Sequence, residues 1–265
     1  MSVRKISVGI LAAVAAFGAN SAQAAFLLTT PVYFQNFDTL ANAANTTSSL
    51  LPGGFEIAEA GTNANNTYAV GTGSSNAGNT YSFGAAGSTD RALGGLRSGN
   101  LIPTFGIQFT NMLGRTITAL NISFLGEQYR LGTAGRADRL AFEFSTTATN
   151  LLGTGFTALT ALDFSSPTTS GTVGVLDGNL VANQRTVAGT IAGLELLAGQ
   201  SIFLRFLDID VTGADDGLGI DNFRAEAVTL GAVPEPSTWM MLIAGFGFIG
   251  AALRGRRVKG KSVLA

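Results

Sequence analysis

Apolar and polar residues alternate with period two in several windows of the chain, most clearly over residues 105–110, 120–124 and 140–145. Successive side chains of a β-strand point to opposite faces, so this alternation predicts strands with one buried face and one wet face. Strands of this kind belong to antiparallel sheets. Two other stretches, Val32 to Phe37 and Ser201 to Ile209, are apolar on both faces and predict central strands.

Turn-forming residues separate these windows, and we find no convincing amphipathic helix between residues 25 and 233. Many short strands with such spacing predict an all-β fold, a single jelly-roll-like antiparallel β-sandwich of about ten to twelve strands over residues 25–232. No linker or fixed-period repeat divides this region. Residues 38–100 are richest in Gly, Ala, Asn, Ser and Thr, which predicts long loops and shorter strands there.

The N-terminus has the pattern of a secretory signal peptide over residues 1–24. Arg4 and Lys5 precede a short apolar segment, and the A-x-A sequence formed by Ala22 and Ala24 follows. A membrane anchor needs a longer apolar run. We therefore expect a signal helix that is cleaved after Ala24, which leaves residues 25–232 as an exported domain.

The C-terminus contains an uncharged run over residues 239–253, followed by a basic cluster over 254–261. As a helix the run is about 22 Å long, short against a hydrocarbon core of about 30 Å. It spans if its flanking residues reach both interfaces, with the basic end in the cytoplasm. These flanks are Trp239 on one side and Arg254, Arg256 and Arg257 on the other. The alternative is a buried core helix, which three glycines and the adjacent cations disfavour.

Pro234, Glu235 and Pro236, the apolar helix opened by Trp239 and the terminal Arg cluster together resemble the PEP-CTERM sorting tail, also known as the ice-binding protein C-terminal motif. The resemblance covers residues 233–261, with the motif at 233–238, the transmembrane helix at 239–253 and the basic cluster at 254–261. It implies recognition by an exosortase, a membrane transpeptidase of Gram-negative bacteria that make exopolysaccharide. It further implies cleavage near the motif, then release or attachment outside the cell.

The body of the chain resembles a jelly-roll region found in bacterial secreted proteins, through segments 87–96, 126–130, 136–140 and 215–223. This resemblance implies a β-sandwich accessory domain. It brings no agreed activity and no catalytic residues. The implied partners are therefore the exosortase, the inner membrane and, in this context, exopolysaccharide.

The amino-acid composition excludes several classes of function. Without the two targeting ends, nine basic and 16 acidic residues remain, a net charge of −7, and all three lysines lie in those ends. Nucleic-acid binding, which depends on a basic face, is therefore not expected. The chain has no Cys and no His, which excludes Ser-His-Asp and Cys-His catalysis and the usual zinc and copper sites.

Five of the 17 acidic residues fall within 14 positions, between residues 208 and 221. Clustered carboxylates are the hard oxygen ligands that Ca²⁺ prefers. We therefore expect a structural Ca²⁺ site in a loop between strands. The alternative is a solvated turn whose Asp side chains cap backbone N–H groups. The candidate ligands are Asp208, Asp210, Asp215, Asp216 and Asp221.

A mixed-charge segment over residues 127–139 offers further candidates. Its arginines suit an anionic or hydroxylated ligand, although ion pairs on a sheet face are the commoner arrangement. Glu127 and Asp138 are candidates for a glycosidase pair, since two carboxylates suffice for that reaction. Four tyrosines are candidates for stacking on sugars or, more commonly, for the core: Tyr33, Tyr68, Tyr81 and Tyr129.

Two functions follow. The first is a non-enzymatic, exported cell-surface or extracellular-matrix β-sandwich protein that is an exosortase substrate in an exopolysaccharide or biofilm context. The alternative is a secreted carboxylate-dependent hydrolase acting on glycans. The absence of His and Cys favours the first.

Overall fold

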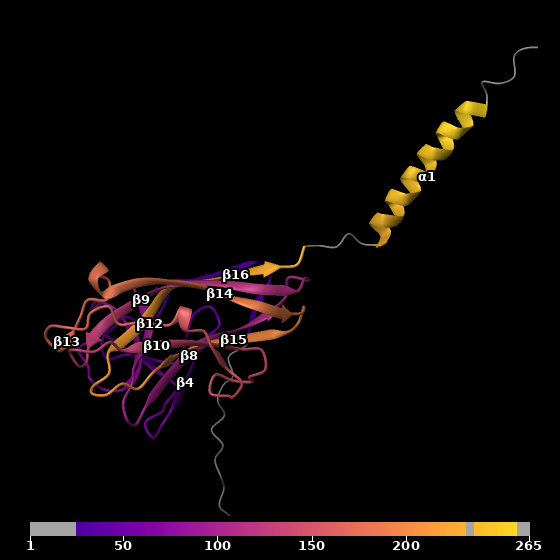
Figure 1. Ribbon diagram of the computed structural model, residues 1–265. Coiled ribbons are helices and arrows are strands. Elements are labelled where there is room, and N and C mark those ends of the chain that lie inside the picture. Colours follow the sequence, from indigo (N-terminus) through magenta and orange to yellow (C-terminus); the bar gives the residue numbers. More distant parts are fainter. Residues whose placement is uncertain (1–24, 232–235, 259–265) are drawn as a thin grey trace, which may run out of the picture.

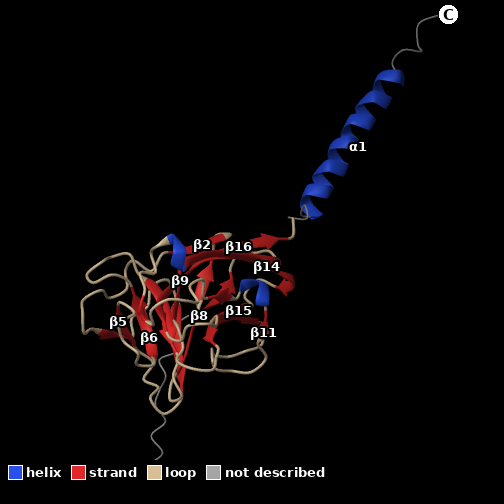
Figure 2. Ribbon diagram, turned by 60° about the vertical axis from the view of Figure 1, so that its left-hand side comes forward, coloured by secondary structure: helices blue, strands red, loops and turns tan. Residues whose placement is uncertain are grey.

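Two β-sheets packed face to face and one C-terminal helix make up the described residues, 25–231 and 236–258, of the computed structural model (Figure 1). The predicted signal peptide, with Ala22 and Ala24, lies outside the described residues, as do Pro234 and Glu235. Figure 2 shows that the sandwich is built almost entirely of strands and loops. The predicted all-β sandwich is confirmed.

The first sheet has seven strands. They are β1 (Phe26–Leu28), β4 (Phe55–Ala60), β8 (Ile102–Asn111), β10 (Arg139–Ser145), β11 (Thr157–Ala158), β12 (Phe164–Ser165) and β15 (Ser201–Asp208). Their order is β1-β8-β15-β10-β11, with β4 also beside β8 and β12 also beside β10. Strand β15 is central, as its apolar pattern on both faces predicts.

The second sheet has nine strands. They are β2 (Val32–Gln35), β3 (Thr47–Ser48), β5 (Tyr68–Gly71), β6 (Asn79–Phe83), β7 (Ala92–Leu96), β9 (Ile117–Leu131), β13 (Gly174–Val175), β14 (Gln184–Leu196) and β16 (Gly217–Thr229). Their order is β13-β9-β16-β7-β6-β5-β3, with β14 also beside β9 and β2 also beside β16.

Three features differ from the predictions. Strand β2 is not central, because it pairs only with β16 and leaves Val32 and Phe34 exposed. Two pairs, β1 with β8 and β5 with β6, are parallel. The described residues form sixteen strands, four of only two residues, and a period-two pattern is not recognisable over two residues.

Phe206 on β15 lies at the centre of the core between the sheets. Its ring contacts Phe105 and Phe142 of its own sheet, with centroids 5.5 and 5.3 Å away. Across the sandwich it contacts Phe124 and Phe223 at 5.1 and 6.2 Å. The contact with Phe105 is stacked and the other three are edge-to-face; aromatic pairs of both kinds add to the stability that burial provides.

The helix α1 (Pro236–Val258, yellow in Figure 1) covers the predicted helix over 239–253 and contains Trp239, Arg254, Arg256 and Arg257. Its described apolar side chains, from Met240 to Leu253, are exposed, and a helix that is apolar all round needs an apolar environment. Within the described part of the chain, however, no helix combines the length and the apolarity that crossing a membrane requires. Crossing by 239–253 therefore stays a prediction.

Candidate functional site

Strand β9 divides its side chains between the two faces of the second sheet. Alternate residues from Leu120 to Phe124 lie in the core, so Glu127 and Tyr129 point to the outer face. On the neighbouring strand β16, Ile220 lies in the core and Asp221 therefore points outward. Glu127 is opposite Gly219 in the register, which makes Glu127 and Asp221 diagonal neighbours on one face.

A hydrogen-bonded chain of side chains runs from Glu127 to the loop before β7. The Tyr129 hydroxyl lies 2.7 Å from Glu127 Oε2 and 2.8 Å from Asn179 Oδ1. Asn179 Nδ2 donates to Asp90 Oδ2, and Gln184 Nε2 donates to Glu127 Oε1 at 3.1 Å. We call Asp90, Glu127, Tyr129, Asn179 and Asp221 the outer-face cluster.

Proton counting indicates that Glu127 is protonated in this arrangement. A phenol has one proton to donate, yet the Tyr129 hydroxyl lies between two acceptors. If the Glu127 carboxyl carries a proton, it donates to Tyr129, and Tyr129 donates to Asn179. Burial, with the charges of Asp221 and Asp90, raises the pKa of Glu127 to about 8. Hydrogen bonds that Tyr129 and Gln184 can donate to the ionised carboxylate oppose this shift but do not cancel it.

Asp221 holds the one unsatisfied oxygen of this cluster. It is 4 % exposed, and its Oδ1 is buried without a hydrogen-bond partner among the described residues. Its Oδ2 accepts from Asn222 Nδ2 at 2.7 Å. Burial, with the charges of Asp90 and Asp38, raises the pKa of Asp221 to about 7. A buried acceptor without a donor is costly, so this oxygen marks a place for a further donor.

A β-bulge aims Asp221 at this place. The register of β16 against β9 shifts between Asp221 and Arg224, and Asn222 adopts φ 50° within the shift. Bulges re-aim side chains and are common next to functional sites, and non-glycine residues rarely adopt positive φ. The local backbone therefore supports a functional role for Asp221.

Stacked aromatic rings cover the outer face beside Glu127. Tyr81 stacks on Phe83 with centroids 4.9 Å apart, and Phe83 stacks on Tyr129 at 5.0 Å. A Cβ at Gly178 would lie 2.5 Å from the Tyr129 ring, so this loop approaches closely only because it has glycine there. All four candidate tyrosines are buried, which agrees with the prediction that they are core residues rather than exposed sugar-stacking residues.

Beyond the bulge the outer face is open. One cross-strand row runs from Phe34 through Arg224 and Ser123 to Ala188. Phe34 is 56 % exposed, and Arg224 donates to Glu226 at 2.7 Å beside it. We call this row and its neighbour the open platform. The neighbouring row is Val32, Glu226, Asn121 and Thr190.

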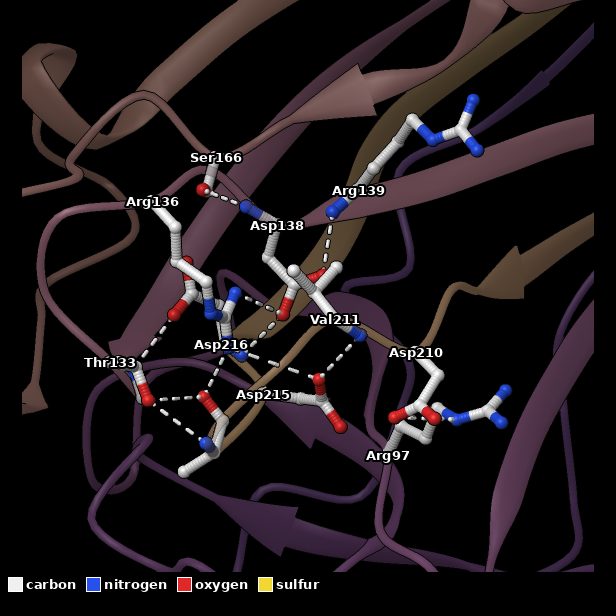
Figure 3. A network of polar contacts seen from close by, with 12 residues as sticks. Arg97, Thr133, Arg136, Asp138, Arg139, Ser166, Asp210, Val211, Asp215 and Asp216 are labelled. Carbon is white, nitrogen blue, oxygen red and sulfur yellow. Dashed lines mark hydrogen bonds and ion pairs between the residues drawn. The ribbon is translucent and has the colours of Figure 1, made fainter.

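A second group of charges, most of which Figure 3 labels, joins the two sheets at one end of the sandwich. Its members come from the loops at the ends of β7, β9 and β15 and before β10 and β16. We call it the end network: Arg97, Arg136, Asp138, Asp208, Asp215 and Asp216. Asp208, at the end of β15, belongs to it because its carboxylate accepts from the N–H of Arg97 at 3.0 Å.

Most carboxylates of the end network are satisfied by the fold itself. Asp138 accepts from the N–H groups of Arg139 and Asp216, both at 2.7 Å, and lies 3.3 Å from Arg136 Nη1. Asp216 in turn accepts from the N–H of Gly132 at 2.7 Å. Backbone donors from the β9–β10 and β15–β16 connections and from the first residue of β10 therefore converge on two carboxylates, which indicates a structural role.

The five predicted calcium ligands lie in three different places. Asp208, Asp215 and Asp216 lie in the end network, Asp221 lies on the outer face, and the Asp210 side chain is 73 % exposed and 3.6 Å from Arg97. In the part of the chain that the structure describes, no group of three or more acidic, His or Cys side chains is placed to hold a metal ion. The five do not form one site, and calcium binding stays a prediction that melting with and without a chelator tests.

The structure also separates Glu127 from Asp138, the two residues of the predicted glycosidase pair. Glu127 points to the outer face, whereas the next residue, Gln128, points inward and donates to Asp216 Oδ2 at 3.0 Å. Asp138 belongs to that inner network through the N–H of Asp216. The two carboxylates therefore lie on opposite sides of β9. The arginines of the segment are mostly in ion pairs, Arg136 with Asp138 and Arg139 with Asp163.

The fold defines a β-sandwich protein with a helical tail. Residues 232–257 match the family model of the PEP-CTERM protein-sorting motif. The tail is a PEP-CTERM sorting motif, which implies an exported protein with a C-terminal membrane anchor that an exosortase sorts. The predicted motif and its boundaries near 233–261 agree with this match. No curated protein matches the chain.

The solved structures that match the chain share little sequence with it. A xylan-binding domain from Paenibacillus barcinonensis is 10 % identical over 75 % of this chain and 95 % of its own, with a TM-score of 0.36. A family 11 carbohydrate-binding module from Clostridium thermocellum is 10 % identical over 75 % and 98 %, with a TM-score of 0.33. A cleaved adhesin domain of Lys-gingipain from Porphyromonas gingivalis is 13 % identical over 74 % and 91 %, with a TM-score of 0.34.

Sequence reasoning missed Asp90, Asn179 and Phe34. Asp90 and Asn179 lie far from Glu127 along the chain, and only the fold brings them to it. Phe34 sits in an apolar run that predicts burial, and no feature of the sequence marks it as exposed.

Proposed function

We propose that the sorted product is a cell-surface or extracellular-matrix protein of the exopolysaccharide or biofilm context, and that it binds glycan on the outer face of its second sheet without catalysis. The observation that carries this proposal is the buried, unsatisfied Asp221 Oδ1 at the edge of the open platform. An acceptor in need of a donor suits a hydroxyl-rich ligand. The platform places one exposed aromatic ring, Phe34, among mostly polar side chains, which together offer a sugar stacking and hydrogen bonds.

The exposed ring of Phe34 supplies the apolar part of this site. Aromatic faces pack against other flat apolar surfaces, and Phe34 is opposite Arg224 of the Arg224–Glu226 pair, which offers further polar contacts. A glycan chain lying along the platform therefore reaches Asp221 at one end. The site uses side chains from four strands of one rigid sheet.

Retardation of the processed protein in gels that contain the host's exopolysaccharide tests this function. We expect Phe34→Ala to weaken binding about threefold to tenfold, because a stacked aromatic contributes about 0.5–1.5 kcal/mol. Met112→Ala, a change at an exposed apolar residue in the turn after β8, is the control and should bind normally. Equal retardation of the unmodified protein in gels with and without polysaccharide would reject glycan binding.

Processing makes a separate prediction. Intact-mass analysis of inner membrane, outer membrane and medium should recover a species that begins at Ala25 and ends near Pro234 to Pro236 outside the cell. The signal peptidase and the exosortase both read linear segments, so this result does not depend on the sandwich. A species that ends at Ala265 in the inner membrane would show that the tail is only an anchor.

A glycan hydrolase is the second candidate, because the structure pairs Glu127 with Asp221 rather than with Asp138. Diagonal neighbours on a sheet face lie about 7–8 Å apart, and inverting glycosidases separate their carboxyls by about 6.5–9.5 Å. We expect no release of reducing ends from the exopolysaccharide. Release that Glu127→Gln and Asp221→Asn both abolish would replace the binding proposal with a hydrolase.

A further inference from the structure

The outer-face cluster concentrates acidic side chains, and the nearby cation of Arg91 stabilises the charge of Asp90 without forming an ion pair with it. Asp90, Glu127 and Asp221 lie near one another, since the charge of Asp90 raises the pKa values of both others. None of the three takes part in an ion pair among the described residues. The neighbouring Arg91 is buried, and it donates instead to Ser82 and to backbone carbonyls of Gly71 and Ala85.

The cluster has a buried floor and an exposed rim. Glu127 and Asp221 are 3 % and 4 % exposed, whereas Asp90, Asp38 and Asn222 around them are exposed. The rim is therefore acidic, and the unsatisfied Asp221 Oδ1 lies on the buried floor beneath it. A metal ion is a poor occupant, because no described group of three acidic side chains is placed to ligate one.

We propose that the outer-face cluster binds a primary ammonium group, and that the ligand is a glycan with amino sugars whose nitrogen is not acetylated. An ammonium donates three hydrogen bonds and carries a positive charge. One of these bonds goes to Asp221 Oδ1, and the Asp90 carboxylate supplies further negative charge beside it. This inference rests on the proposed function, because it names the class of glycan that the open platform presents to Asp221.

Titration calorimetry of the processed protein at pH 7.5 with glucosamine oligomers and N-acetylglucosamine oligomers of equal length tests the inference. We expect the deacetylated oligomers to bind about tenfold more tightly, since a charge-assisted hydrogen bond is worth about 1.5–3 kcal/mol. Asp221→Asn should abolish this difference, and Asn222 remains beside it as a donor. Its melting temperature reports whether the variant folds.

Asp210→Asn is the matched control, because it removes the same charge from an exposed side chain outside the cluster. Retention of the tenfold preference in this variant supports specific binding. Loss of the preference in both variants would indicate attraction of a cation to an acidic protein and would overturn the inference. Lysine oligomers that bind as tightly as glucosamine oligomers would overturn the assignment to amino sugars.

The pH dependence supplies a second readout. Binding needs an ionised Asp221 and a protonated sugar amine, so affinity for glucosamine oligomers should rise severalfold between pH 6 and about pH 7.5 as the Asp221 carboxyl ionises, and fall above about pH 8 as the amine loses its proton. The titratable groups that face Asp221 are Glu127 and Tyr129 from β9, Asp90 from the loop before β7 and Asp38 from the loop after β2. A flat profile would contradict the inference.

Failure of the ammonium site and failure of glycan binding give different results. Equal binding of acetylated and deacetylated oligomers would overturn the ammonium site and leave glycan binding intact. Absence of binding to either oligomer, together with absence of retardation by the native exopolysaccharide, would overturn the proposed function itself.

Discussion

Asp138→Ala is expected to lower the free energy of unfolding of the processed protein by about 3–5 kcal/mol, the range for breaking a buried ion pair from one side. Asp138 is fully buried and accepts from two backbone N–H groups as well as from Arg136. Its removal leaves the partly buried Arg136 cation and both N–H groups without their acceptor. Urea unfolding measures the loss.

The matched control for this change is Glu226→Ala. Glu226 also pairs with an arginine, but both side chains are about two-fifths exposed, so the loss should stay within about 1 kcal/mol. Asp138→Asn keeps the shape of the side chain and one acceptor oxygen, so its loss of unfolding free energy should lie between those of Asp138→Ala and Glu226→Ala. A loss below 1 kcal/mol for Asp138→Ala would mean that the end network does not hold the two sheets together.

The free energy of unfolding is expected to fall as the pH rises from about 5 to about 8. Burial raises the pKa of Glu127 to about 8 and that of Asp221 to about 7, and it raises the pKa values of Asp208, Asp215 and Asp216 as well. Between the unfolded and folded pKa values, the folded state binds more protons than the unfolded state. Stability from these groups is therefore complete below the unfolded pKa and is lost as the pH passes the folded pKa.

Glu127→Gln isolates the contribution of one group. The Gln amide donates to the Tyr129 hydroxyl as a protonated carboxyl does, and it does not titrate. At pH 5 the variant should match the unmodified protein. At pH 8 it should melt at least about 2–4 °C higher, because each kcal/mol shifts the melting temperature by that amount in a domain of this size.

Glu195→Gln makes the same change at an exposed position of β14 and should leave the pH profile unaltered. Thermal melts of the three proteins at half-unit pH steps provide the comparison. If Glu127→Gln keeps the slope of the unmodified protein between pH 6 and pH 8, Glu127 is ionised in the folded state. The hydrogen-bonded chain through Tyr129 would then need another proton donor.

The outer-face cluster and the end network show why clustered acids in a sequence do not identify a site. Asp215 and Asp221 are six positions apart, yet they belong to different networks. The turn before β16 keeps Asp215 at the end of the sandwich, whereas the strand carries Asp221 onto a sheet face. In the end network, backbone donors satisfy Asp138 and Asp216 but leave Asp208 Oδ1 without a donor, and in the outer-face cluster Asp221 Oδ1 lacks one.

Local sequence alone determined the strands with strict alternation, the central position of β15 and the sorting tail. Alternation reports burial on one face directly, because the side-chain period of a strand is two. A sorting motif is read as a linear segment, so its match at residues 232–257 needs no fold. Two-residue strands and the exposed β2 escaped prediction, because their pairing depends on partners far along the chain.

Only the tertiary structure decided which carboxylates meet. Glu127 and Asp138 are close in sequence, but β9 points Glu127 outward while Asp138 joins the network of the inward Gln128. Glu127 and Asp221 are far apart in sequence, and the register of β9 with β16, with its bulge, places them on one face. Register and bulge are properties of paired strands, so no single stretch of sequence specifies them.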